Sequence, residues 1–163
     1  MKIPQRYEEI RQSLPDEVSF GCGGIALFPL GKIESAQVGY SVKADGTSLC
    51  TGKDGGWQPA WLVIGQETAC GDPIFIDTDN AALPVYTTMH GVGAWQPNDV
   101  AGSAEIFAAC LKELSHVAAG RGSPGELERN PLEDDERQQF LNRIADLNRS
   151  ATAPEFWDLQ LSC

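Results

Sequence analysis

The sequence predicts an α+β domain with a mostly antiparallel sheet of about five to six strands, packed by an N-terminal helix and two C-terminal helices. Between Trp57 and Trp95, three short runs rich in β-branched and aromatic residues are separated by Gly, Pro and Asp, which is the pattern of successive strands. The connections between them, of about seven residues, are too short for the crossover that parallel strands require. Helical periodicity appears on both sides of this region.

The N-terminal helix is predicted over residues 4–14. Its apolar stripe recurs at helical spacing, and Pro15 ends it because the residue before a proline is disfavoured in the α region. The stripe consists of Ile3, Tyr7, Ile10 and Leu14. Strands are then expected at about 24–29 and 37–42, with a weaker one around Leu49.

The central strands are predicted at about 60–65, 73–77 and 84–89. The first two are almost continuously apolar, so both of their faces should be covered, one of them by helices. Trp61, inside a strand, is assigned to the core. Trp57 and Trp95, which flank loops, are expected at the surface, because tryptophan is enriched in binding hot spots.

A long helix follows the sheet. Its apolar stripe runs from Ile106 to Val117, either Ser103 or Asn98 can cap its start, and Gly120 can end it. Residues 120–131 form a connector rich in Gly, Pro and charge.

A second helix is predicted to begin with Asn130 as its N-cap and to run to about Asn148. Near the C-terminus, Trp157, Leu159 and Leu161 alternate with polar residues, which favours either a closing strand or a packed tail. We expect residues 1–163 to form a single domain, with 120–163 as a C-terminal helical extension packed on it.

The net charge of −11 excludes partners that require a basic surface. Nucleic acids and anionic membranes call for clustered Lys and Arg. Residues 54–111 contain seven carboxylates and no Lys or Arg, so the loops of the central sheet are expected to form an acidic face for a cationic protein partner. The residues expected to bind this partner are Asp54, Trp57, Glu67, Asp72, Asp77, Asp79, His90 and Trp95.

The sequence predicts neither a metal site nor a cofactor. The five cysteines are widely spaced, no C-x-x-C pair occurs, and only two histidines are present. We therefore expect the cysteines to be buried free thiols. Asp77 to Asn80 begins like a calcium loop, but Ala82 and Thr88 stand where Gly and Glu are required. The aspartates are interpreted as turn residues that bind their own backbone.

His90 is the one candidate for catalysis. A catalytic histidine needs a nucleophile and an orienting carboxylate nearby, for which Cys22 and Asp77 are available by residue type alone. No hydrolase motif selects this combination, so a hydrogen-bonded structural role is favoured for His90.

The first residues lack the apolar segment of a secretory signal, and the longest apolar run, Ile25–Leu30, is far too short to span a membrane. We therefore expect a cytoplasmic protein.

The order of the motifs resembles the SMI1/KNR4 group of the SUKH superfamily over roughly residues 5–117. The motifs are Leu14-Pro15, the Gly-Gly-Ile-x-Leu-Phe-Pro stretch at 23–29, Trp61 to Gly65, Gly71 to Asp77, Pro84-Val-Tyr, His90-Gly91, and the helix with Phe107 and Leu111.

The resemblance implies an α+β fold without catalytic residues. It also implies an immunity protein that binds and neutralises a cognate toxin domain, commonly a basic nuclease. The alternative is a small-ligand-binding protein or a hydrolase that uses a pocket near His90, Asp72 and Asp77.

Overall fold

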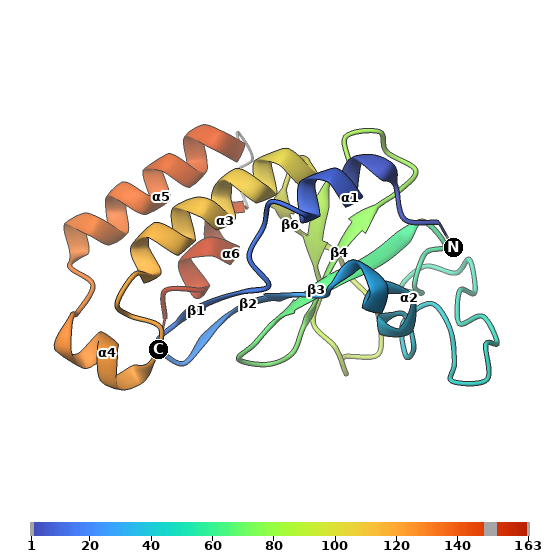
Figure 1. Ribbon diagram of the computed structural model, residues 1–163. Helices are drawn as coiled ribbons and strands as arrows, with labels where there is room; N and C mark the ends of the chain where they lie inside the picture. Colours follow the sequence, from blue (N-terminus) through green and yellow to red (C-terminus); the bar gives the residue numbers. More distant parts are fainter. Residues whose placement is uncertain (1, 149–152, 163) are drawn as a thin grey trace.

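Six antiparallel strands form one sheet, and their order in the sheet follows the chain (Figure 1). The computed structural model describes residues 2–148 and 153–162. The strands are Glu17–Phe20 (β1), Gly23–Leu27 (β2), Trp61–Glu67 (β3), Pro73–Asp77 (β4), Val85–Thr87 (β5) and Asn98–Ala101 (β6). The predicted α+β class and the antiparallel pairing are both confirmed.

The strands predicted between β2 and β3 are absent, and the two edge strands of the sheet, β1 and β6, were not predicted. Residues 37–42 do not form a strand; they follow a 3-10 turn, Leu30–Lys32 (η1), and a short helix, Ile33–Ala36 (α2). Only isolated bridges, Val38 to Val42 and Val42 to Ser48, occur there, so the weak strand around Leu49 is wrong as well. Sequence reasoning missed β1 and β6, which have only four residues each.

The remaining helices are Gln5–Arg11 (α1), Ala104–Ala118 (α3), Pro124–Arg129 (α4), Asp134–Asn148 (α5) and Ala153–Leu159 (α6). Ser103 caps α3 as predicted, because its Oγ accepts the Ile106 N–H at 3.2 Å. The connector predicted at 120–131 contains α4. Figure 1 shows α3 and α5 side by side, with α1 next to the start of α3.

The start predicted for α5 is wrong, because Asn130 ends α4 instead. The Arg121 guanidinium donates to the carbonyls of Asn130 (2.9 Å) and Pro131 (3.3 Å) and holds them outside the following helix. At the start of α5, the N–H of Glu133 donates to the Glu136 carboxylate at 3.3 Å, which is half of a capping box.

The closing strand predicted near the C-terminus is also wrong, whereas the alternative of a packed tail is confirmed. Trp157 and Leu161 are buried, and Leu159 between them is 69% exposed. A spacing of four residues places Trp157 and Leu161 on one face of a helical turn, with Leu159 facing away. The Trp157 indole N–H donates to the carbonyl of Val100 in β6 at 3.0 Å.

The main core lies between the sheet and the helices. Leu62, Ile64, Ile74 and Ile76 are fully buried on one face of the central strands. They belong to one cluster with side chains of α3, α5 and α6, including Phe107, Leu111, Leu114, Phe140, Ile144 and Trp157. The helical cover predicted for this face is confirmed.

The opposite face of the sheet is covered by aromatic side chains from loops. Val63 and Phe75 are buried there against Trp57, whose indole N–H donates to the carbonyl of Trp61 at 3.1 Å. Trp57 is only 1% exposed, so its predicted surface position is wrong. Trp61, predicted as core, is half-buried on this face, and so is Trp95.

The expectation of buried free thiols is met by Cys110, whereas Cys70 is exposed and Cys50 is half-buried. Cys22 is disulfide-bonded, whereas Cys50, Cys70 and Cys110 are free; Cys163 lies outside the described residues. Within residues 2–148 and 153–162, no helix combines the length and apolar character needed to cross a bilayer.

Candidate partner-binding site

The predicted acidic residues fall into separate groups because β4 lies between them. Asp72 precedes this strand and Asp77 ends it. At about 3.3 Å per residue, the strand places the two roughly 16 Å apart. Asp77 Oδ1 accepts the N–H of Asp79 at 3.0 Å in the turn that follows. Asp77 and Asp79 therefore lie at the opposite end of β4 from Asp72.

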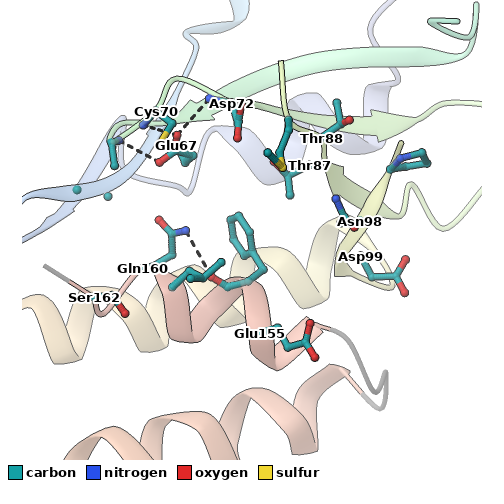
Figure 2. A pocket seen from close by; sticks show the side chains of 17 residues that line it. Glu67, Cys70, Asp72, Thr87, Thr88, Asn98, Asp99, Glu155, Gln160 and Ser162 are labelled. Carbon is teal, nitrogen blue, oxygen red and sulfur yellow. Dashed lines mark hydrogen bonds between the residues drawn. The ribbon is translucent and has the colours of Figure 1, made fainter. Parts of the chain in front are cut away.

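Glu67 organises the turn between β3 and β4. Its carboxylate accepts backbone N–H groups from Ala69 (3.0 Å), Cys70 (2.6 Å) and Asp72 (3.2 Å), as Figure 2 shows. The sequence predicted such turn bonds for the aspartates and did not predict them for Glu67. The bonds to Glu67 fix the position of Asp72 relative to the end of the sheet.

Asp72 anchors His90. Asp72 Oδ1 accepts the backbone N–H of His90 at 2.9 Å and lies 2.6 Å from its Nδ1. The His90 side chain remains 53% exposed and that of Asp72 20%. His90 is therefore hydrogen-bonded, as predicted, but through a different aspartate than Asp77. The open combination with Cys22 fails as well, because a disulfide-bonded sulfur is not a thiolate nucleophile.

A cavity of about 650 Å³ opens beside this turn, and we call it the acidic cleft. The turn between β3 and β4 forms one wall, the ends of β5 and β6 form the second, and α6 lies opposite (Figure 2). It is lined by Gly23, Gly24, Glu67, Ala69, Cys70, Asp72, Thr87, Thr88, Met89, Pro97, Asn98, Asp99, Glu155, Phe156, Leu159, Gln160 and Ser162.

The lining of the acidic cleft combines negative charge with exposed apolar surface. It contains the carboxylates of Glu67, Asp72, Asp99 and Glu155. None of the described residues that line it is Lys or Arg. Met89 and Leu159, two of the four large hydrophobic residues that are exposed in the described ranges, lie on opposite walls, 59% and 69% exposed. Protein-binding surfaces commonly combine apolar and polar side chains in this way, so we take the acidic cleft as the candidate site.

Three of the eight predicted binding residues lie at or beside the acidic cleft: Glu67, Asp72 and His90. Asp54 and Asp79 are exposed on loops outside its lining, and Trp95 is half-buried in the aromatic cluster with Trp57. Sequence reasoning missed Asp99 and the contribution of α6. The four-residue spacing of Trp157 and Leu161 was the available signal for that helix.

In the described ranges, no three His, Cys, Asp or Glu side chains lie in an arrangement that would hold a metal ion. What the acidic cleft offers chemically is a cation-attracting, partly apolar surface with one anchored imidazole beside it. No family model matches the chain, and neither the curated proteins nor the solved structures contain a match. The resemblance to the SMI1/KNR4 group therefore stays a prediction.

Proposed function

We propose that this chain is a non-catalytic binding protein that captures a basic protein partner in the acidic cleft. The observation that carries the proposal is the lining of the cleft, where four carboxylates and no Lys or Arg surround exposed apolar side chains. Aligned charge of one sign speeds the approach of a partner of opposite sign, and the apolar centre supports affinity once contact is made.

The partner that we propose is a toxin domain that the chain neutralises. The SMI1/KNR4 resemblance supports this class, and a nuclease needs a basic cleft to hold its nucleic acid. An acidic surface with a hydrophobic centre would occupy such a cleft and exclude the substrate.

The experiment is affinity capture from the native host, with the chain as bait, followed by binding kinetics with the captured domain. The cleft variant is Asp72→Asn with Glu155→Gln. The matched control, Glu128→Gln with Asp146→Asn, removes the same charge from exposed positions on α4 and α5. We expect the cleft variant to slow association on the order of ten-fold at low salt, and the control to leave it nearly unchanged. Equal rates for both variants would refute the assignment of the cleft.

We place the chain in the cytoplasm, where a nuclease toxin would act. Disulfides persist mainly in oxidising compartments, so the state of Cys22 bears on this placement. Trapping thiols with iodoacetamide in intact cells and mapping the label by mass spectrometry tests it. Alkylation of Cys22 in the cells would support a reducing cytoplasm, and the disulfide of this structure, if preserved in the cells, would refute the placement.

A second candidate function is the binding of a small cationic ligand beside His90. It is favoured by one observation: Asp72 both orients the imidazole and lines the acidic cleft. Asp77 cannot belong to this site because it lies at the other end of β4. A thermal-shift screen with polyamines and basic amino acids tests this function, and a stabilisation that Asp72→Asn abolishes would support it. No shift with any amine would eliminate it.

A further inference from the structure

The outer face of the sheet, opposite the main helical core, carries a second surface with its own chemistry. Its cluster is built by side chains from the strands and from loops; in the described chain no helix contributes a residue to it. We call four partly exposed aromatic members of this cluster the outer aromatic face, namely Tyr40, Trp61, Tyr86 and Trp95; Phe28, which also packs on the main core, is not counted among them.

The rings of this cluster are arranged in two layers. Trp57 and Phe75 are buried and form the inner layer, with their ring centroids 5.0 Å apart. Trp61 packs on both of them, at 5.4 Å from Trp57 and 4.9 Å from Phe75. Tyr86 lies 5.8 Å from Phe75. Because the inner rings hold the outer ones in place, the outer aromatic face is a preformed surface rather than a set of mobile side chains.

The strand register places a carboxylate beside two of these rings. Asp77 is the partner of Trp61 in the pairing of β3 with β4, and Asp99 is the partner of Tyr86 in the pairing of β5 with β6. Directly paired residues have Cβ atoms about 4.5–5.5 Å apart. Burial raises the pKa of Tyr86, and the charges of Asp99 and Asp77 raise it further, so both carboxylates act on its phenol.

We propose that the outer aromatic face binds arginine side chains of a protein partner. The face of an aromatic ring attracts a cation, and a planar guanidinium can stack on the ring while it forms paired hydrogen bonds with a carboxylate. Aromatic surfaces also bind nucleic-acid bases by stacking, but those sites include a basic groove for the phosphates. A chain with a net charge of −11, and no Lys or Arg between residues 54 and 111, favours arginine.

This inference goes beyond the proposed function because it assigns a second surface and a specific side chain to it. None of the four rings of the outer aromatic face lines the acidic cleft, although the carboxylate of Asp99 belongs to both surfaces. A partner that binds both the acidic cleft and the outer aromatic face would have to reach around the edge of the sheet. A partner that binds only one of these surfaces would show that the two act separately.

The test compares a hexa-arginine peptide with a hexalysine peptide, which have equal charge and differ in the planar guanidinium. Binding is followed by NMR through the indole N–H signals of the tryptophans. We expect the arginine peptide to bind about five-fold more tightly, because only the planar guanidinium can stack on a ring and also form paired hydrogen bonds with a carboxylate. Equal affinities of the two peptides would overturn the proposal.

Variants locate the effect. Tyr86→Leu should abolish the preference for arginine, and Tyr86→Phe, which keeps the ring, should retain it. Asp77→Asn should weaken both peptides, whereas Glu128→Gln with Asp146→Asn should weaken neither more than two-fold. A preference that survives in Tyr86→Leu would refute the assignment to this face. The cleft variant, Asp72→Asn with Glu155→Gln, should keep the arginine preference, so failure of one surface leaves the other separately testable.

Discussion

Gln37 offers the sharpest test of the fold, because its side chain replaces a missing piece of the sheet. The strand β2 pairs with β3 only at residues 65–67 of β3, and the pairing of β3 with β4 shifts register between Val63 and Gly65. At Val63, where β2 no longer pairs with β3, the Gln37 side chain binds both backbone groups. Its Nε2 donates to the Val63 carbonyl at 2.9 Å, and its Oε1 accepts the Val63 N–H at 3.1 Å. Nε2 also donates to the carbonyl of Ile33 at 2.8 Å.

The perturbation is Gln37→Leu, which keeps the size of the side chain and removes its hydrogen bonds. Gln37 is 2% exposed, so water cannot reach the two abandoned groups of Val63 without rearrangement. Each buried polar group left without a partner costs about 1–3 kcal/mol. The added apolar burial offsets part of this, by at most about 1.5–3 kcal/mol. We expect a net loss of about 2–4 kcal/mol in the free energy of unfolding, a large fraction of the roughly 5–15 kcal/mol typical of a domain.

Urea denaturation followed by circular dichroism and tryptophan fluorescence measures this loss. With a slope of about 2 kcal/mol per molar urea, the midpoint should fall by about 1–2 M. The control is Gln139→Leu at an exposed position of α5, which should change stability by less than about 0.5 kcal/mol. A loss for Gln37→Leu no larger than for the control would refute the reasoning.

Gln37→Glu separates the two halves of the interaction. The carboxylate keeps an acceptor for the Val63 N–H but places negative charge next to the carbonyls of Val63 and Ile33. Protonation restores a donor, so we expect the pKa of the new carboxyl to be higher in the folded than in the unfolded chain. The variant should therefore lose stability relative to the wild type as pH rises through that folded-state pKa, and recover it at lower pH.

Three further predictions test other elements. Trp57→Ala should destabilise the chain by about 3–5 kcal/mol in denaturation, and the half-buried Trp95→Ala should cost less, whereas equal costs would contradict the burial of Trp57. Gly24→Ala should cost more than about 1 kcal/mol, because Gly24 has a φ of +153° and a Cβ there would lie 2.2 Å from the carbonyl oxygen of Val18; Gly31, which has open space, is the control. The N–H of Glu133, and then the Arg121 guanidinium, lower the pKa of Glu136. The wild type should therefore lose stability as pH falls below about 4.3 and through this lowered pKa, and Glu136→Gln should lack that part of the loss in acid titrations.

The acidic cleft shows how function depends on residues that are distant in sequence. Its carboxylates come from the turn after β3, from β6 and from α6, near residues 70, 99 and 155. Counting charge along the sequence showed that residues 54–111 are acidic, but it assigned them to one face. The length of β4 separates Asp72 from Asp77, so the charge is divided between the two ends of this strand.

The sequence by itself determined the central strands and α3. Continuous apolar residues bounded by Gly and Pro, an apolar stripe of helical period and a Ser cap are signals that lie within one short segment. The sequence also predicted that both faces of the central strands are covered. Successive side chains of a strand point to opposite faces, so consecutive apolar residues require burial on each face.

Tertiary structure decided the elements whose local signal is weak or points the wrong way. Residues 37–42 have the composition of a strand, yet Gln37 is used through its side chain, because β3 needs a partner where β2 ends. Trp157 and Leu161 form a helical face only because Val100 and the core lie beside them. A local sequence pattern reflects the preferences of a few neighbouring residues. Burial and hydrogen-bond pairing depend instead on which distant segments come into contact, and both candidate binding surfaces are formed by such contacts.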